Sequence, residues 1–467
     1  MMNLCWGSAM ATITGQYPLE GVQMPTWLLR FDKHGACTSP ATRTLLLDKL
    51  ASGAHSDVIL FSHGWNNDFD DAAAMYARFL RAFETLAASH PLSRAGVGFA
   101  PVFIGVVWPS IWLSFDSGPQ IAATAAATAE AVEDNAAAQA LADRVAATGE
   151  LQAVERLYAL LALPRLDEAQ ARELAVLAAP AFGTVADDET GTARSTSADE
   201  LLAMLRAMQQ AEAGTAAPPR PIDDWGEAAP AADRAAELQT AGLLSFLDPR
   251  QALRLFSVYQ MKDRAGVVGA HGVASLLRDV IAAAVSARVH AVGHSYGCKV
   301  ILSAVCAPPP LPRPLNSLLL LQPAVSHLCF ADLIPRSGKP GGYRRALERV
   351  QAPILSTYSD DDFPLHRTFH LALRRDSDLG DQDIGIAADT DTTAGKPPSN
   401  YAALGGYGPR RAGQRLVDPM PAAAAPYPAF GAAEAVIGLD GSQGLIGSHG
   451  DITNAATAWA LHRLMAR

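Results

Sequence analysis

The strongest candidate for chemistry is a serine that lies between two glycines. The segment 289–305 reads VHAVGHSYGCKVILSAV, so Ser295 is the centre of a Gly-x-Ser-x-Gly pattern formed with Gly293 and Gly297. An apolar run precedes the pattern, and a small-residue helical run follows it. A tight turn from a strand into a helix exposes the serine hydroxyl, and the glycines relieve crowding that a Cβ would cause. The segment predicts that Ser295 is a nucleophile; the alternative is an ordinary glycine-bounded turn.

Two further motifs precede the serine, and each ends an apolar run. Residues 63–66 read His-Gly-Trp-Asn after DVILFS, and residues 108–110 read Trp-Pro-Ser after PVFIGVV. With the serine pattern in this order, the sequence resembles the α/β-hydrolase superfamily, particularly its poorly characterised bacterial esterase/lipase-like serine hydrolases. The resemblance covers residues 55–112 and 270–365, with a weaker match at the C-terminus. It implies the α/β-hydrolase fold and a triad in the chain order Ser, acid, His.

The resemblance also implies where an oxyanion would be bound. The backbone N–H of Trp65, in the loop that begins with His63 and Gly64, would be one donor, and the N–H of Tyr296 would be the other. A tetrahedral intermediate needs two donors directed at its oxygen, and the loss of one costs about 10²-fold to 10³-fold in rate. The alternative for His63 and Trp65 is packing at a strand end.

The acid of the triad is expected just beyond a later strand. The apolar run 354–358 is followed by the sequence Ser-Asp-Asp-Asp at 359–362. The resembled pattern sets the acid three residues after a small turn residue, so Ser359 selects Asp362. Asp360 and Asp361 remain as alternatives and are otherwise solvated turn or capping residues. A calcium site is disfavoured because hard cations need several spaced oxygens.

The base is expected on a loop near the C-terminus, between a last strand and a closing helix. His449 lies in the sequence SHGDI, after the apolar run 436–439 and before an amphipathic helix. The alternative for His449 is a surface loop histidine. His294, at the variable position of the serine pattern, is interpreted as structural rather than as the base.

Other polar clusters do not favour a metal site. His366 and His370 lie four residues apart and could share a helix face, but the glutamate of an HExxH motif and a third ligand are missing. The aspartates at 376, 378, 381 and 383 fail the spacing of an EF-hand, so a solvated loop is expected there. We therefore expect no metal and no organic cofactor.

Strand and helix patterns alternate along the chain, which predicts an α/β fold with a mainly parallel sheet flanked by helices. A helical pattern covers 72–88, where Met75, Phe79, Phe83 and Leu86 recur near a 3.6-residue period. The expected buried strands are 27–31, 58–61, 102–107, 289–292, 318–321, 354–358 and 436–439.

Two stretches interrupt the alternation. Residues 112–250 are Ala-rich and helical with no strand pattern, and 376–430 read as a long loop. We expect a catalytic domain formed by 1–111 and 251–467, with 112–250 inserted as a helical cap over the Ser295 pocket or as a surface for homo-oligomer formation. The 376–430 stretch is a second insertion in the same domain.

Composition restricts the partners and the compartment. The net charge of −10 argues against nucleic acid, because affinity for phosphate backbones comes largely from clustered Lys and Arg. The five scattered cysteines fit reduced thiols. The start MMNLCWGSAMA lacks the basic region of a signal peptide, and no run of about 18 apolar residues suggests a membrane span. A cytoplasmic protein is expected, although leaderless export would leave no signal of this kind.

The function expected from these residues is hydrolysis of carboxylic esters through an acyl-enzyme, as in a carboxylesterase or lipase. The substrate would be a small or lipid-like ester. A peptidase, amidase or acyltransferase would use the same triad. A rival from another class is a catalytically silent scaffold that binds a protein partner through the helical insertion.

Overall fold

The computed structural model describes most of the catalytic region and part of the insertion. The described residues are 14–65, 67–92, 98–110, 138–139, 141–146, 151–182, 184–187, 192–195, 197–199, 201–203, 205–206, 247–335, 338–362, 364–368, 402–427, 430 and 435–467.

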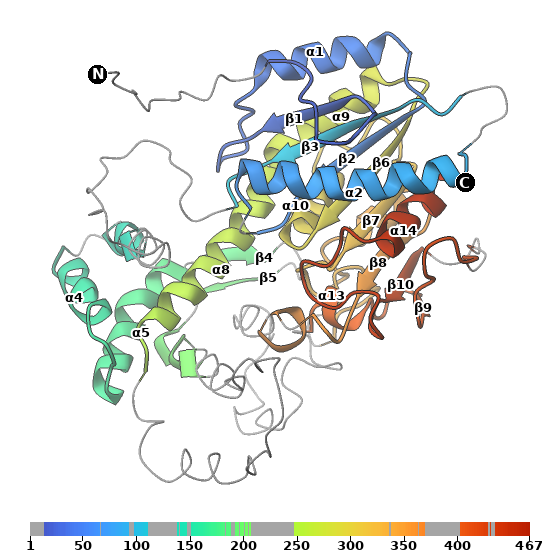
Figure 1. The fold of residues 1–467 in the computed structure, drawn as a ribbon. Coiled ribbons are helices and arrows are strands. Elements are labelled where there is room, and N and C mark those ends of the chain that lie inside the picture. Colours follow the sequence, from blue (N-terminus) through green and yellow to red (C-terminus); the bar gives the residue numbers. More distant parts are fainter. Residues whose placement is uncertain are drawn as a thin grey trace, which may run out of the picture.

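Eight strands form one sheet in the order β1-β3-β2-β6-β7-β8-β10-β9, and every pair of neighbours is parallel (Figure 1). Each expected strand is present, which confirms the predicted fold class. Strand β9, which extends the sheet at one edge, is not among the expected strands. The bounds are β1 (Thr26–Arg30), β2 (Asp57–Ser62), β3 (Pro101–Val107), β6 (Arg288–His294), β7 (Ser317–Leu321), β8 (Ile354–Tyr358), β9 (Arg415–Val417) and β10 (Val436–Asp440).

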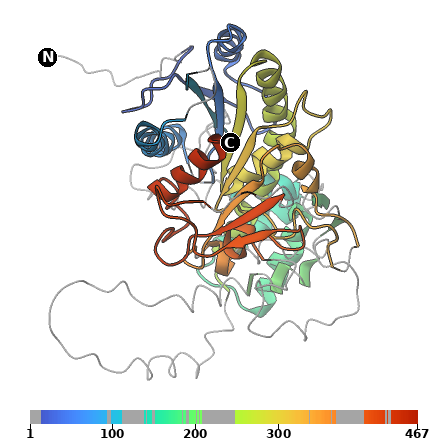
Figure 2. The same ribbon diagram turned by 90° about the vertical axis from the view of Figure 1, so that its right-hand side faces the viewer.

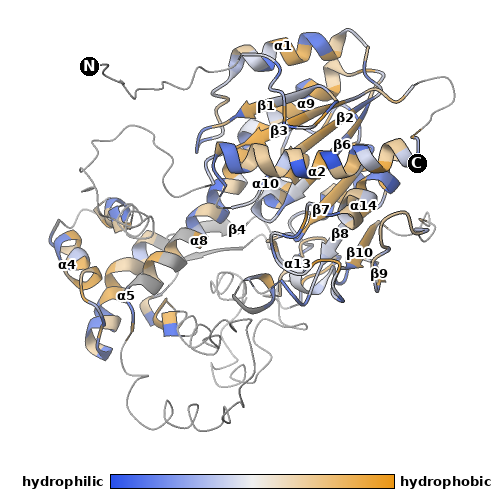
Figure 3. Ribbon diagram, in the orientation of Figure 1, coloured by the Kyte–Doolittle hydropathy of each residue, from blue (hydrophilic) through white to orange (hydrophobic). Residues whose placement is uncertain are grey.

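Helices cover both faces of the sheet. Helices α1 (Pro40–Ala51), α9 (Ala274–Ala283) and α10 (Tyr296–Cys306) share one apolar cluster with the sheet. A second cluster joins α2 (Phe69–Ser89) and α14 (Ala455–Met465) to the opposite face. Figure 2 shows α2 and α14 on one side of the sheet and α9 and α10 on the other. Because both faces are covered, the strands read as continuous apolar runs, which appear in hydrophobic colours in Figure 3.

Helix α2 begins three residues earlier than its apolar pattern suggested. Asp68 caps the helix by accepting from the Asp71 N–H, and the Asp71 side chain accepts from the Asp68 N–H in return. This reciprocal pair satisfies two N–H groups that a helix start leaves without partners. Met75, Phe79 and the other two residues of the pattern are buried in the second cluster, as predicted.

The described part of the insertion has an apolar cluster of its own. Helices α4 (Leu151–Leu161) and α5 (Glu168–Phe182) both contribute to it, and Leu157 and Leu160 are fully buried there. The expectation of no strands was wrong, because β4 (Thr184–Asp187) and β5 (Thr192–Ser195) form an antiparallel pair. This hairpin lies within the stretch 112–250, for which helices alone were expected.

One long helix connects the insertion to the sheet. Helix α8 (Arg250–Val267) contributes Leu253 and Phe256 to the cluster of the insertion, whereas Met261 and Ala265 belong to the cluster beside the sheet. The π-helix η2 (Val268–Val273) and α9 continue it. The 26 residues Val258–Ala283 are long and apolar enough for a membrane span by length and composition. Most of this helix is buried against α10 and α1, which is the position of a core helix.

The stretch 376–430 is not wholly a loop. Its described part, from residue 402, contains the short helix α13 (Leu404–Tyr407) and the strand β9, which pairs with β10. The short helices η3 (Arg344–Glu348) and η4 (Pro364–Thr368) flank β8. His370 and the four aspartates at 376, 378, 381 and 383 lie outside the described residues.

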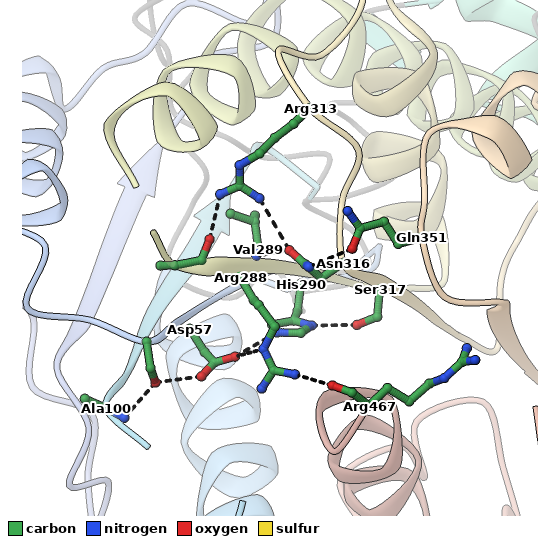
Figure 4. Close-up of polar contacts among 12 residues, drawn as sticks. Asp57, Ala100, Arg288, Val289, His290, Arg313, Asn316, Ser317, Gln351 and Arg467 are labelled. Atoms are coloured by element: carbon green, nitrogen blue, oxygen red, sulfur yellow. Dashed lines mark hydrogen bonds and ion pairs between the residues drawn. The ribbon is translucent and has the colours of Figure 1, made fainter. Parts of the chain in front are cut away.

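A buried polar network ties together the amino ends of the central strands (Figure 4). The Asp57 carboxylate at the start of β2 accepts from Arg288 at 2.7 Å and faces the His290 ring at 3.1 Å. The other ring nitrogen of His290 lies 2.7 Å from the Ser317 hydroxyl on β7, and Arg288 also donates to the carbonyl of Arg467. The network therefore joins three neighbouring strands and Arg467, two residues after the end of α14.

Candidate active site

The nucleophile candidate lies at a strained turn between β6 and α10. Ser295 has φ 54° and ψ −126°, in the region that L-residues rarely adopt. Its backbone is held from both sides, because its N–H donates to the Leu321 carbonyl at 3.1 Å and its carbonyl accepts from the Ala324 N–H at 3.3 Å. Such strain persists where the surroundings fix the backbone, and it is concentrated at functional sites.

Two glycines allow the turn to pack closely against the end of β2. A Cβ at Gly297 would lie 2.1 Å from the carbonyl oxygen of Ser62. A Cβ at Gly64 would meet the Cβ of Ser295 itself. Gly293 is equally confined, here by the backbone of Cys298. The glycines of both motifs therefore bring the loop after β2 into contact with the serine.

Three side chains from three different loops form a continuous relay. The Ser295 Oγ lies 2.8 Å from Nε2 of His449, and Nδ1 of His449 lies 2.8 Å from Oδ2 of Asp362. A neutral imidazole protonated at Nδ1 satisfies both contacts, because it donates to the carboxylate and accepts from the hydroxyl. Ser295 and Asp362 are buried, whereas the His449 side chain is 25% exposed. Solvent can therefore reach the relay at the His449 side chain.

Of the three neighbouring aspartates, the structure brings Asp362 to the histidine. Its Oδ1 accepts from the Leu365 N–H at 3.0 Å, and its Oδ2 accepts from the Gln322 side chain at 2.9 Å. Asp360 is largely exposed and pairs with His366. The Asp361 N–H donates to the hydroxyl of Ser359. Gln322 was missed by the sequence analysis, and its only signal is a polar residue directly after the apolar run of β7.

The loop that carries His449 is held at both ends. Asn454 caps α14 and donates from Nδ2 to the carbonyls of Leu445, at 2.8 Å, and Asp451, at 3.1 Å. His294 donates from Nε2 to the carbonyl of His449 at 2.9 Å. Burial, together with the neighbouring His449 ring, lowers the pKa of His294 to about 3. His294 is therefore neutral and contacts the main chain of His449, not the serine hydroxyl.

His63 organises the loop after β2. Its Nδ1 donates to the Gly64 carbonyl at 2.8 Å, and its Nε2 accepts from the Trp108 N–H at 3.2 Å. The Trp108 indole in turn donates to the His63 carbonyl, and the two rings stack. Complete burial lowers the pKa of His63 to about 4, so the ring is neutral near pH 7. The two upstream motifs thus meet in one hydrogen-bonded unit.

Further contacts fix the same loop. The His63 N–H donates to the Tyr76 hydroxyl, which donates to the Val106 carbonyl. The Ser110 hydroxyl accepts from the Asn67 N–H and donates to the Asn67 carbonyl. Trp65 is 37% exposed, and the centroid of its ring lies 6.4 Å from that of the Tyr296 ring. Asn66 lies outside the described residues. The oxyanion role of the Trp65 and Tyr296 N–H groups stays a prediction.

Among the described residues, no group of three His, Cys, Asp or Glu side chains is arranged to hold a metal ion. His366, half of the weak zinc pair, stacks on the Tyr407 ring and faces Asp360.

One comparison with known proteins gave a match. A family model described as alpha/beta hydrolase of unknown function (DUF900) matches residues 38–160, which include β2, α2 and β3. No curated protein and no solved structure gave a match. The matched segment contains the His63 loop that packs on Ser295, and the parallel sheet with helices on both faces is the architecture of that family's fold. Residues 38–160 are therefore similar to an α/β-hydrolase family, and the parallel sheet flanked by helices is consistent with the α/β-hydrolase fold.

Proposed function

We propose that the protein is a serine hydrolase that cleaves carboxylic esters through an acyl-enzyme. The observation that carries the proposal is the relay from Ser295 through His449 to Asp362, with 2.8 Å at both contacts. A nucleophile, a base within hydrogen-bond reach and a carboxylate that orients the base are the parts that nucleophilic catalysis requires.

In the proposed reaction, Ser295 attacks the ester carbonyl while His449 Nε2 takes the hydroxyl proton. Asp362 holds the imidazole in the tautomer with a free Nε2 and stabilises it when it becomes charged. His449 then gives the proton to the leaving alcohol. In the second half, His449 takes a proton from water, the hydroxide attacks the acyl group, and Ser295 is released with its proton restored.

The oxyanion would be bound between the loop after β2 and the start of α10. The backbone N–H groups of Trp65 and Tyr296 are the proposed donors, and the contact between Gly64 and Ser295 supports this placement. The N-terminus of α10 adds favourable dipole potential at the same point. Trp65, which follows Gly64 in this loop and is 37% exposed, offers apolar surface that suits a small or lipid-like ester.

A peptidase, amidase or acyltransferase could use the same relay. A panel of esters, amides and anilides with a common acyl group distinguishes these by the preferred leaving group. A higher rate of acyl transfer to an added alcohol than to water would indicate an acyltransferase. The rival from another class is a silent scaffold, in which Ser295 would not react at all.

The experiment that tests the proposal is labelling with a fluorophosphonate probe, followed by mapping of the modified residue. We expect the label on Ser295, and we expect Ser295→Ala to lose both labelling and ester hydrolysis by about 10⁴-fold to 10⁶-fold. Ser303→Ala is the control, because Ser303 is a buried serine in α10, the helix that follows Ser295, and its hydroxyl contacts Tyr343. Label on another residue, or full activity in Ser295→Ala, would contradict the assignment.

A further inference from the structure

A single buried glutamine connects the acid of the relay to the turn that holds the nucleophile. Gln322 follows β7, is fully buried and has φ 43°, in the left-handed region. Residues near Gln322 in the sequence contact the main chain of Ser295. The Leu321 carbonyl accepts from the Ser295 N–H, and the Ala324 N–H donates to the Ser295 carbonyl. The side chain of Gln322 contacts the other part of the site, because its amide donates to the Asp362 carboxylate.

The orientation of the Gln322 amide is determined by its partners. Its Nε2 donates to Oδ2 of Asp362 at 2.9 Å, and a carboxylate can only accept there. Its Oε1 accepts from the Thr357 hydroxyl at 2.9 Å, and that hydroxyl accepts from the Gln322 N–H at 2.9 Å. Nε2 also lies 3.4 Å from the Gly405 carbonyl. Each polar group of the side chain therefore has a partner, and the amide is held in one position.

Gln322 contacts the same oxygen of Asp362, Oδ2, that accepts from His449. Oδ2 of Asp362 accepts from Gln322 Nε2 and from His449 Nδ1, whereas Oδ1 accepts from the Leu365 N–H. A carboxylate held by donors on both oxygens keeps one orientation while the imidazole gains and loses its proton. Such outer partners of a reacting group contribute through orientation and charge, without contact with the substrate.

We propose that Gln322 is a positioning residue of the active site, which fixes the Asp362 carboxylate in the orientation that His449 requires. This inference rests on the proposed serine hydrolase function. Gln322 also neutralises part of the carboxylate charge, because hydrogen bonds to an ionised group are strong. Its role in the reaction is exerted through Asp362 and His449.

The test compares Gln322→Met, which keeps the length of the side chain but removes its donor, with the wild type. The substrate is p-nitrophenyl butyrate, and active sites are counted with the fluorophosphonate probe. We expect kcat per labelled site to fall by about 10-fold to 100-fold, as for loss of a donor to a charged group. KM should change less than about twofold, because the buried Gln322 does not reach the substrate.

The pH profile separates positioning from simple support of the fold. Without the Gln322 donor, the carboxylate keeps more of its negative charge and favours protonated His449. Because the base must be unprotonated to act, the acid limb of kcat/KM should move to higher pH. A variant that merely folds less well would have fewer labelled sites and an unmoved acid limb, and that result would overturn the inference.

Two variants on β8 complete the experiment. Thr357→Val removes the hydroxyl that holds the Gln322 amide. It should shift the acid limb in the same direction as Gln322→Met, but by less. This variant tests the inference even if Gln322→Met does not fold. Ser356→Ala is the matched control, because its buried hydroxyl has no hydrogen-bond partner among the described residues. If the acid limb does not move in either Gln322→Met or Thr357→Val, the positioning role of Gln322 is wrong but the proposed serine hydrolase function stands. If the probe does not label the wild type, both are wrong.

Discussion

Gly64 lies so close to Ser295 that a Cβ added to the glycine would be 2.7 Å from the Cβ of the serine. The same Cβ would lie about as close to the ring and carbonyl of His294. The loop that carries Trp65 therefore rests directly on the turn that carries the nucleophile. Their relative position depends on the absence of one methyl group.

Gly64→Ala should consequently displace the loop from the serine. Because the Trp65 N–H is the proposed oxyanion donor, we expect kcat to fall by about 10²-fold to 10³-fold, comparable to the loss of one donor. Steady-state kinetics with a p-nitrophenyl ester measure this. Gly98→Ala is the matched control, since a Cβ there meets no atom within 4 Å. Equal rates in the two variants would exclude a catalytic role for the loop.

Substitution of the three aspartates after β8 tests the assignment of the acid. Asp362→Asn keeps the size of the side chain but cannot hold His449 in the productive tautomer, so kcat should fall by about 10⁴-fold. Asp360→Asn and Asp361→Asn should stay near wild-type activity, because neither side chain contacts His449. A crippling effect of Asp360→Asn would instead show that the acid lies two residues earlier.

The buried histidines predict a loss of stability in mild acid. Burial lowers the folded-state pKa of His63 to about 4, and that of His294 to about 3, below the ordinary value of about 6.5. Below pH 6.5 the unfolded chain therefore binds protons that the folded chain does not. The free energy of unfolding should fall with decreasing pH by about 1.4 kcal/mol per pH unit for each histidine, until the folded-state pKa is reached.

Urea unfolding at pH 7 and pH 5 measures this dependence. His294→Gln removes one of the two groups and should reduce the slope between these pH values. A slope that is unchanged in His294→Gln would mean that this histidine is already protonated in the folded state.

The role of the insertion can be tested by replacing residues 120–240 with a short linker. Leu253 and Phe256 of α8 are buried in the cluster of the insertion, so both should be changed to Gln in the same variant to keep it soluble. A changed preference for ester chain length, with Ser295 still labelled, is expected for a cap. Unchanged preference with loss of an oligomer in light scattering would favour the oligomer surface.

The strands could be predicted because each is buried on both faces and reads as an apolar run. Ser295 could be proposed from its glycine pattern, whereas Asp362 and His449 could be proposed only because the resemblance to α/β hydrolases implies an acid after a later strand and a histidine near the C-terminus. Strand β9 has only three residues, none fully buried, so it has no such pattern. Gln322 has no spacing that relates it to Asp362, because their contact depends on the positive φ of Gln322 and on two neighbouring strands.

The Asp57 network lies at the opposite edge of the sheet from the relay. Strand β2 has six residues, which at a rise of about 3.3 Å each places the two edges roughly 20 Å apart. Random mutagenesis of the loops that follow β6, β8 and β10 would therefore alter the chemistry without touching the contacts of Arg288 and His290. The chain should accordingly accept directed evolution toward new substrates, with the network at the amino edge left out of the mutated library.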